Sequence, residues 1–295
     1  MKATTEPQTR HTIPAVVKAM ELLRLLGETG GETTTKALAL RLGIPRTSCY
    51  RILRSLIARD WVRLVEGGRH ELSLGLLPIL APLHPIAALA AAVEPALHVV
   101  ANRTQLTAKV SMRQGDYAVT VARVESPQQT SVAVRLGASF HLAYGSSGTV
   151  LLSDLRREEV DRILAVAPQP CWERQKPADV FKRLKELREK GTCIDLGLFS
   201  PSCHAISAPL CVGCEGVVAA MTIIGFPHEL PRQRVPTLTK LLLEGTRQAE
   251  KELRKLRADR SAANATSGGR RVLKRPAILG SAARLQGDRL GSDAS

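Results

Sequence analysis

The sequence lacks the signatures of several large classes of protein. Its six cysteines stand at irregular spacings, so they do not form the framework of a small disulfide-rich secreted fold. The polar opening MKATTEPQTRHT contains no apolar signal segment. A reducing cytoplasm is therefore the expected location of the protein.

Long apolar runs are also scarce. The longest stretch with little charge, residues 72–93, is interrupted by Pro78, Pro82 and Pro85 and is rich in alanine, which drives membrane insertion only weakly. A membrane-spanning helix needs about 20 predominantly apolar residues. We therefore expect that this stretch does not cross a membrane.

Motifs that would indicate an enzyme are missing too. The segment YGSSGT, residues 144–149, is not a G-x-S-x-G elbow, and the chain has no glycine-rich phosphate loop, H-E-x-x-H motif or kinase signature. We interpret His141 near Ser146 as coincidence rather than a catalytic pair. The sequence thus predicts neither catalysis nor a cofactor, with a hydrolase-like, ligand-binding enzyme as the alternative.

One cysteine pair leaves a question open. The motif CVGC, Cys211 to Cys214, fits half a zinc site or a redox pair, but no second paired-ligand motif accompanies it. We predict no metal site, and the sequence does not decide whether this pair responds to redox conditions.

Acidic residues are too few to balance the basic ones. The chain holds 42 Lys and Arg against 27 Asp and Glu, a net charge of +15. Residues 1–80 carry +5, residues 81–249 carry +4 and residues 250–295 carry +6, so the ends are basic while the long middle is nearly balanced. Basic ends indicate a polyanionic partner, although such charge also accompanies non-specific binding.

What the chain does contain is enough apolar sequence to fold. With 295 residues, 44% of them hydrophobic, it can bury a sizeable core, and its length favours two domains.

The stretch LALRLGIPRTSCYRILRSLIARDW, residues 38–61, predicts two helices separated by a turn at Gly43, Ile44 and Pro45. If the second helix spans 46–59, one face is apolar at helical spacing. That face consists of Cys49, Ile52, Leu53, Leu56 and Ile57.

The opposite face of this helix carries hydrogen-bond donors and cations, which suit phosphates and base edges. Its predicted DNA-binding residues are Arg46, Thr47, Ser48, Tyr50, Arg51 and Arg54. The following run WVRLVEGGRHELSL predicts a hairpin that turns at Gly67-Gly68. Arg69 beside that turn is a further DNA-binding candidate, and a solvated turn arginine is the equal alternative.

Two helices precede the turn. Residues 35–42 form the shorter one, with Thr34 or Thr35 as its N-cap. The longer, residues 13–26, has its apolar positions at Val16, Ala19, Met20, Leu23 and Leu26. Three helices and a hairpin in this order predict a winged helix-turn-helix.

The remaining sequence predicts an α+β domain, because helical stretches are interspersed with hairpins. A linker helix is expected over 76–102, and hairpins around Gly115-Asp116 and Gly213–Gly216. Helical stretches are expected at 147–154, 158–166, 177–190 and 231–257. The tail from Ser261 is rich in Gly, Ser, Ala and Arg and is expected to be disordered.

Several motifs along residues 13–257 together carry a family resemblance. They are AVVKAMELLRLL, LALRLGIPRTSCYRILRSL, GRHELSLG, HLAYGSSGTVLL, KELREKGTCIDLG and HAISAPL…GVVAAMTIIG. In this order they resemble an IclR-type transcriptional regulator. The resemblance implies an α+β protein in which a winged helix binds double-stranded operator DNA, a linker helix helps to dimerise it and a GAF-like domain senses a small molecule. It also implies a homodimer or a dimer of dimers.

The resemblance assigns a role to each part of the chain. The expected division is a flexible N-terminus, the winged helix-turn-helix, the linker helix region, the effector-binding and oligomerisation domain, and a basic tail. Their bounds are 1–12, 13–75, 76–94, 95–257 and 258–295.

The resemblance also implies the residues of the effector site. They are Ser146, Ser147, Gly148, Asp195, Cys203, Ala205, Thr222 and Ile224. The N–H groups at the start of the helix near Ser147 would hold a carboxylate. Thr222 and Cys203 are equally well read as ordinary core residues of a strand.

Two positions depart from the family pattern. Thr149 stands where a lysine is usual, and Ile224 stands where a second hydroxyl-bearing residue is frequent. An apolar Ile224 leaves a polar ligand atom without a partner, so we expect a monocarboxylate as the effector.

Overall fold

The computed structural model describes residues 12–30, 33–212 and 216–266. The chain forms two compact units that divide between His84 and Pro85, here called the N-terminal and C-terminal domains. Each is described separately below.

The N-terminal domain is a winged helix-turn-helix. Its elements are α1 (Pro14–Glu28), β1 (Thr33–Thr34), α2 (Thr35–Leu42), α3 (Arg46–Ile57), β2 (Val62–Val65) and β3 (Arg69–Leu72). The three strands form one antiparallel sheet in the order β1-β3-β2, and β2 and β3 are the predicted hairpin.

The turn between α2 and α3 has identifiable causes. Thr34 caps α2 by accepting a hydrogen bond from the N–H of Ala37 at 3.3 Å. Gly43 ends the helix in the left-handed conformation with φ of 62°, which a residue with a Cβ adopts only at a cost. Pro45 then precedes α3, so the chain cannot continue the first helix.

The core of this domain confirms the face predicted for α3. Cys49, Leu53 and Leu56 are buried, and Ile52 and Ile57 are partly buried against the same cluster. The helix ends two residues earlier than expected, at Ile57.

The apolar face predicted for the first helix is wrong in its phase. Val16 and Met20 are 49% and 65% exposed, and the buried residues of α1 are Leu22, Leu25 and Leu26. At about 3.6 residues per turn, Val16 and Met20 lie on a different side of the helix from Leu22 and Leu25. Because α1 carries apolar residues on more than one side, the sequence pattern does not show which side meets the core.

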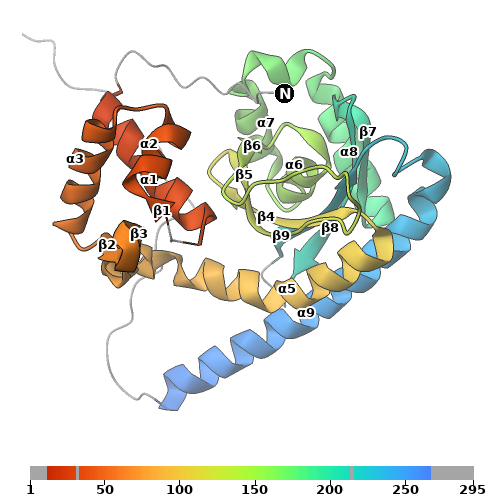
Figure 1. The fold of residues 1–295 in the computed structure, drawn as a ribbon. Coiled ribbons are helices and arrows are strands. Elements are labelled where there is room, and N and C mark those ends of the chain that lie inside the picture. Colours follow the sequence, from red (N-terminus) through yellow and green to blue (C-terminus); the bar gives the residue numbers. More distant parts are fainter. Residues whose placement is uncertain (1–11, 31–32, 213–215, 267–295) are drawn as a thin grey trace, which may run out of the picture. The chain divides into compact units, whose positions relative to one another are not determined.

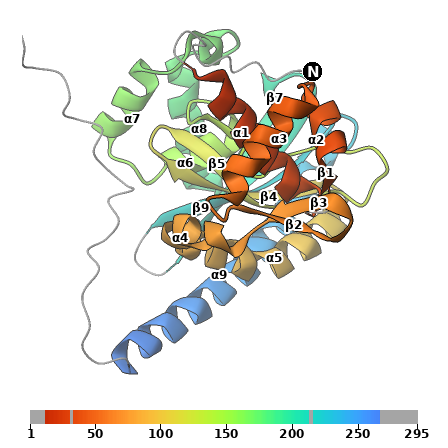
Figure 2. The same cartoon turned by 60° about the vertical axis from the view of Figure 1, so that its left-hand side comes forward.

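The C-terminal domain is built on one six-stranded antiparallel sheet. Its strands are β4 (Thr107–Gln114), β5 (Tyr117–Val124), β6 (Ser139–His141), β7 (Cys193–Ser200), β8 (Cys203–Cys211) and β9 (Val217–Gly225), in the order β6-β5-β4-β9-β8-β7. The β4–β5 hairpin is confirmed, and β8 pairs with β9 as expected, although the turn residues 213–215 lie outside the described residues. The sheet and its helices are visible in Figures 1 and 2.

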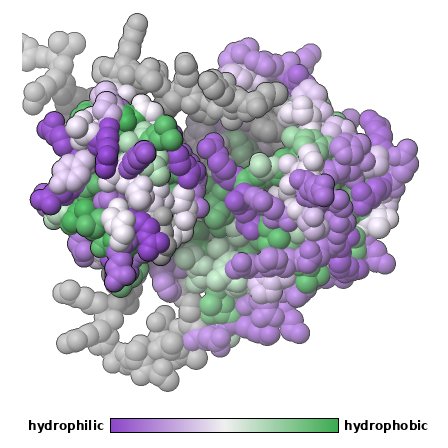
Figure 3. All heavy atoms as spheres, in the orientation of Figure 1, coloured by the Kyte–Doolittle hydropathy of each residue, from purple (hydrophilic) through white to green (hydrophobic). Residues whose placement is uncertain are grey.

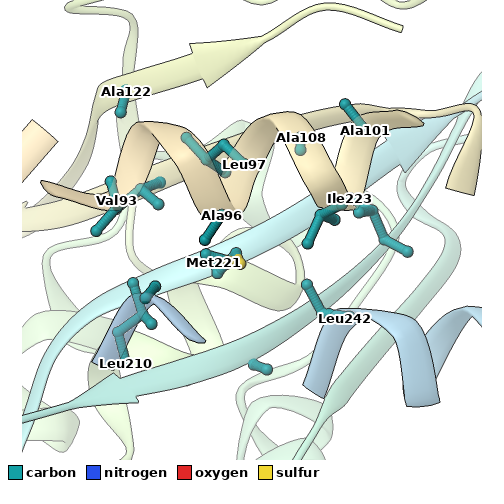
Figure 4. Packing of buried hydrophobic residues seen from close by; sticks show 14 of the residues in the cluster. Val93, Ala96, Leu97, Ala101, Ala108, Ala122, Leu210, Met221, Ile223 and Leu242 are labelled. Atoms are coloured by element: carbon teal, nitrogen blue, oxygen red, sulfur yellow. The ribbon is translucent and has the colours of Figure 1, made fainter. Parts of the chain in front are cut away.

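Helices cover both faces of this sheet. They are α5 (His84–Thr104), α6 (Gly145–Leu152), α7 (Arg157–Ala165), α8 (Pro177–Lys190) and α9 (Val235–Thr266). Helices α5 and α9 pack on one face, where Leu97, Met221 and Leu242 belong to the larger core (Figure 4). Helices α6, α7 and α8 supply a second core on the other face.

Helices α5 and α9 lie side by side (Figures 1 and 2), and a salt bridge of 2.7 Å joins Arg103 to Glu244. Helix α9 continues to Thr266, so the expected disorder from Ser261 is wrong for the first six residues of the tail. Its remainder lies outside the described residues.

The segment before α5 is also helical. Short turns at Leu74–Leu76, Leu77–Leu80 (α4) and Ala81–Leu83 run into α5. By length and composition alone, Leu74–Thr104 is apolar enough to cross a membrane, so the expectation that it does not stays a prediction.

We predict that Leu53→Ala lowers the free energy of unfolding by roughly 2–5 kcal/mol, because Leu53 is 1% exposed and its loss leaves a cavity in a small core. The matched control is Leu40→Ala, where the leucine is 82% exposed and the change should stay within about 0.5 kcal/mol. Urea denaturation of both variants measures this, and equal effects would contradict the packing of α3.

Candidate functional site

The outward face of α3 is polar and accessible. Arg46, Thr47, Tyr50, Arg51 and Arg54 are exposed, and Ser48 is half-buried. Figure 3 shows a largely hydrophilic rim at the left of this domain, where Figure 1 places α3. Because the buried stripe fixes the helix on the core, this face presents donors and cations in a rigid array. It suits the major groove of a duplex.

Arg69 on the wing is less accessible than the arginines of α3. Gly67 and Gly68 form the tip with positive φ angles of 75° and 69°. The Arg69 Nε donates to the carbonyl of Glu66 at 3.1 Å, and its side chain is half-buried. Arg69 is therefore partly held by the tip itself, and its contact with DNA stays a prediction.

In the C-terminal domain, the strand register places the predicted effector residues on one face. Thr222 and Ile224 of β9 point to the side of α6, whereas Met221 and Ile223 belong to the core on the opposite side. Ala205 of β8 and Asp195 of β7 stand in line with Ile224. We call this side the α6 face of the sheet.

Three hydroxyl groups form a continuous chain on the α6 face. The Oγ atoms of Ser146 and Ser207 lie 2.7 Å apart, and Ser207 Oγ lies 2.7 Å from Thr222 Oγ1. All three side chains are buried. Sequence reasoning missed Ser207, although its position two residues after Ala205 in a strand was the available signal.

The start of α6 supplies further donors. A helix that begins at Gly145 leaves the N–H groups of Gly145, Ser146 and Ser147 without intrahelical partners. Gly148 has a packing reason to be glycine, because an added Cβ would lie 2.3 Å from the carbonyl oxygen of Leu142. The free N–H groups and the positive end of the helix dipole suit an anion.

A buried arginine holds α6 in place. Arg183 of α8 donates through Nε to Thr149 Oγ1 at 3.1 Å and through Nη2 to Gln175 Oε1 at 2.7 Å. Gln175 in turn donates to the carbonyl of Ala143, in the turn that leads into α6. This network ties the start of α6 to α8, and sequence reasoning did not find it.

Asp195, Cys203 and Ala205 form the edge of the α6 face. Asp195 is buried, and its Oδ1 accepts from the N–H of Leu198 at 2.7 Å. Burial raises the pKa of the half-buried Cys203, a hydrogen bond with Ser200 lowers it and the charge of Asp195 raises it. Cys203 is therefore a neutral thiol at pH 7. The edge is partly open, since Cys203, Ala205 and Ile224 are each half-buried.

His141 does not form a catalytic pair with Ser146. The His141 Nδ1 accepts a hydrogen bond from the N–H of Ala143 at 3.2 Å, while the Ser146 hydroxyl bonds to Ser207. Burial lowers the pKa of His141, and the nearby Asp116 carboxylate opposes this shift. The geometry thus shows no activated serine at this position.

Lys109 is the least expected residue on the α6 face. It lies on β4 directly opposite Thr222, it is 7% exposed, and its Nζ lies 4.7 Å from the centre of the Phe140 ring. Burial lowers its pKa from 10.5 to about 8. The signal in the sequence was a lysine at an inward position of the alternating strand LTAKVSM.

In the part of the chain that the structure describes, no three His, Cys, Asp or Glu side chains gather as metal ligands would. Cys211 is half-buried, and burial raises the pKa of its thiol. Cys214 lies outside the described residues, so the role of this cysteine pair is still open.

Comparison with known proteins agrees with this arrangement. Residues 15–66 match the sequence model of the IclR helix-turn-helix domain, and residues 85–251 match that of the bacterial transcriptional regulator IclR C-terminal family. The HTH-type transcriptional repressor AllR of Escherichia coli (strain K12) is 24% identical over 247 residues, covering 82% of this chain and 91% of AllR. The regulator KipR of Bacillus subtilis (strain 168) is 24% identical over 244 residues, covering 81% and 96%.

Solved structures show the same fold. The Thermotoga maritima IclR structure aligns with a TM-score of 0.62 and 18% identity, covering 81% of this chain and 98% of that chain. An IclR homologue from Microbacterium hydrocarbonoxydans, complexed with 4-hydroxybenzoate, aligns with a TM-score of 0.61 and 16% identity, covering 82% and 98%.

A winged helix-turn-helix followed by an α+β effector domain defines a class of ligand-responsive DNA-binding proteins. Within this class, the chain belongs to the IclR family of bacterial transcriptional regulators. It is accordingly a DNA-binding regulator with an effector-binding domain. The alternative of a hydrolase-like enzyme is not favoured.

We predict that Lys109→Met raises the free energy of unfolding at pH 7 by roughly 3 kcal/mol, the equivalent of a pKa lowered from 10.5 to about 8. Because the folded pKa is lowered, the unfolded chain binds more protons between pH 8 and 10.5, and the contribution of Lys109 to stability rises with pH there. The difference in the free energy of unfolding between Lys109→Met and the wild type should therefore be largest below pH 8 and decrease above it.

Urea denaturation at several pH values measures this gap. The control is Lys182→Met, which removes the same charge from an exposed position on α8 and should leave stability nearly unchanged. A gap that is constant with pH, or a less stable Lys109→Met, would contradict the burial of an uncompensated ammonium.

Proposed function

We propose that the protein is a cytoplasmic homo-oligomeric regulator that reads double-stranded operator DNA with α3 and responds to a small monocarboxylate. It has no catalytic activity of its own in this proposal. The observation that carries the proposal is that one chain has both a cationic face on α3 in its N-terminal domain and a hydroxyl-lined α6 face in its C-terminal domain.

The DNA-binding part rests on the geometry of α3. Arg51 and Arg54 project from the exposed face, about one and two helical turns after Thr47. Arginine recognises guanine through two hydrogen bonds, and both residues also suit phosphates. Arg46, Ser48 and Tyr50 flank these positions, and Arg69 would add a contact from the wing.

A homo-oligomer is supported by exposed apolar residues in the N-terminal domain. Ile13, which precedes α1, Val16 and Met20 in the first half of α1, and Leu74 and Leu77 after the wing are exposed in the single chain. Contact with another copy of the chain would remove such apolar side chains from water. A dimer would present two α3 helices to two half-sites of an operator.

The effector part rests on the start of α6. The free N–H groups of Ser146 and Ser147 and the hydroxyls of Ser207 and Thr222 line one side, while Ile224 adds apolar surface in the next row. Gly148, Asp195, Cys203 and Ala205 complete the proposed site. The relative bound to 4-hydroxybenzoate supports a small carboxylate of this kind.

We predict that Arg51→Ala weakens operator binding by about 1–3 kcal/mol, because it removes a base contact without touching the core. Its melting temperature should match that of the wild type. A mobility-shift assay at fixed salt, with DNA from upstream of the protein's own gene, measures the affinity.

The control for Arg51→Ala is Arg24→Ala on α1, which also removes one cation. Arg24 is paired with Glu21 at 2.7 Å and with Glu28 at 2.5 Å, so it has no reason to contact DNA. If both variants lose the same affinity, the effect is net charge, and α3 is not the recognition helix. Footprinting on genomic fragments would identify the operator itself.

We predict that benzoate and hexanoate bind more tightly than malonate and succinate. Ile224 gives the ligand an apolar contact and withholds the hydrogen bond that a second carboxylate would need, a loss of about 1–3 kcal/mol. Ile224→Ser should shift the preference towards the dicarboxylates. Calorimetric titration of the whole chain tests this, and tighter binding of dicarboxylates by the wild type would refute the monocarboxylate assignment.

A further inference from the structure

The charge of Lys109 has no counterpart in the described residues. Within residues 12–30, 33–212 and 216–266 its ammonium forms no salt bridge; the charged residue opposite it on β5 is another cation, Arg123, which pairs with Glu125. Burial lowers the pKa of Lys109. Buried charges in proteins are normally paired, because an unpaired charge in a low-dielectric interior is strongly unfavourable. The Phe140 ring compensates only in part, since a cation–π contact is weaker than an ion pair.

The fold itself does not require this charge. Lys109 occupies an inward position of β4 between Ala108 and Val110, both of which are fully buried on the opposite side. An apolar side chain of similar length would fill the same space without the cost of desolvation. A fixed buried cation of this kind is typical of a functional site.

The surroundings of Lys109 match an anionic ligand. Directly opposite lies Thr222, the end of the hydroxyl chain that runs through Ser207 to Ser146 at the start of α6. Phe140 adds an aromatic wall beside the ammonium. One face therefore combines a cation, hydroxyl donors and acceptors, and apolar surface.

This end of the face is also covered. Residues 125–138 form neither helix nor strand, and Thr107, two residues before Lys109, donates through Oγ1 to the carbonyl of Val132 at 3.0 Å. Arg123 bonds to the carbonyl of Val134 in the same segment. Shielding from water strengthens an ion pair formed beneath this segment.

We propose that Lys109 is the charge partner of the effector, its ammonium binding the carboxylate of a small monoanion on the α6 face. This inference rests on the proposed effector site and adds a residue to it. One ammonium neutralises one carboxylate, and the two other cations near this face already have partners: Arg123 pairs with Glu125, and Arg183 donates to Thr149 and Gln175. The ligand class is thus an aromatic or aliphatic monocarboxylate.

The test compares benzoate with benzamide, its neutral analogue of similar shape, by calorimetric titration of the full chain at pH 7. The wild type should bind benzoate more tightly than benzamide. Lys109→Met should lose about tenfold or more in benzoate affinity, as expected for a hydrogen bond to a charged group, and should bind benzamide as the wild type does. Lys109→Arg should retain part of the preference.

The control is again Lys182→Met, whose exposed ammonium on α8 should be irrelevant to benzoate. Since Lys109→Met is expected to be more stable than the wild type, a loss of binding would not reflect misfolding. Unchanged benzoate affinity in Lys109→Met overturns the inference. So does a wild type that binds benzoate no better than benzamide, or binds neither.

A mobility-shift arm separates this inference from the proposed function. Lys109→Met should bind operator DNA as the wild type does, but benzoate should no longer change that binding. If the wild type binds no DNA, the proposed function fails. If the wild type binds DNA and responds to benzoate, and Lys109→Met responds equally, the role of Lys109 alone fails.

Discussion

The pairing of β4 with β9 is the constraint on which the C-terminal domain depends. It joins the β4–β5 hairpin to the β8–β9 hairpin in one sheet, although β4 ends at Gln114 and β9 begins only at Val217. Because side chains alternate along a strand, this register decides which residues meet on each face. It sets Lys109 opposite Thr222, and Val110 opposite Met221. A slip by one residue would send the polar set into the large core.

The two faces of the sheet differ in the polarity of their buried side chains. On the side of α5 and α9, residues such as Leu97, Ile206 and Ile223 form a largely apolar core, and the buried hydroxyls of Thr104 and Thr246 donate to carbonyls of their own helices. On the α6 face, buried polar groups follow one another across the strands: Thr107, Lys109, Ser111, Ser207 and Thr222. Burial of so many polar groups stabilises less than apolar packing would. The apolar packing on the opposite face offsets this loss, so the domain tolerates a polar face.

The sequence predicted most of the architecture, because local patterns specify local structure. The stripe of α3 was visible from helical spacing, and the wing from Gly67-Gly68 between alternating runs. The error in α1 has a physical cause: Val16 and Met20 lie on a different side of the helix from the buried Leu22 and Leu25, and apolar residues on several sides leave the buried side undecided until the other elements pack against it. In a regulator that forms oligomers, such residues would be buried by another copy of the chain.

The site was predicted less completely than the fold. The family resemblance led to Ser146, Thr222 and Ile224, and the register does place the last two on one face. It did not lead to Ser207 or Lys109, because what distinguishes them is their contacts with residues of neighbouring strands. A lysine in an alternating strand reads as a solvated residue until the tertiary structure shows that its side of the strand is covered.

Thr149 stands where the family pattern has a lysine, and the fold supplies a positive charge nearby from another residue. The family pattern suggests a lysine at this position of α6, yet the threonine hydroxyl accepts from the guanidinium of Arg183, and a cation from α8 therefore stands next to the same point. The Nη1 group of Arg183 has no hydrogen-bond partner among the described residues. Positive charge thus remains behind α6, although it comes from another helix. Arg183 also donates to Gln175, which in turn donates to the carbonyl of Ala143 in the turn before α6. The residue that replaces the lysine's charge therefore also holds the α6 N-terminus in position, where the effector is expected to bind.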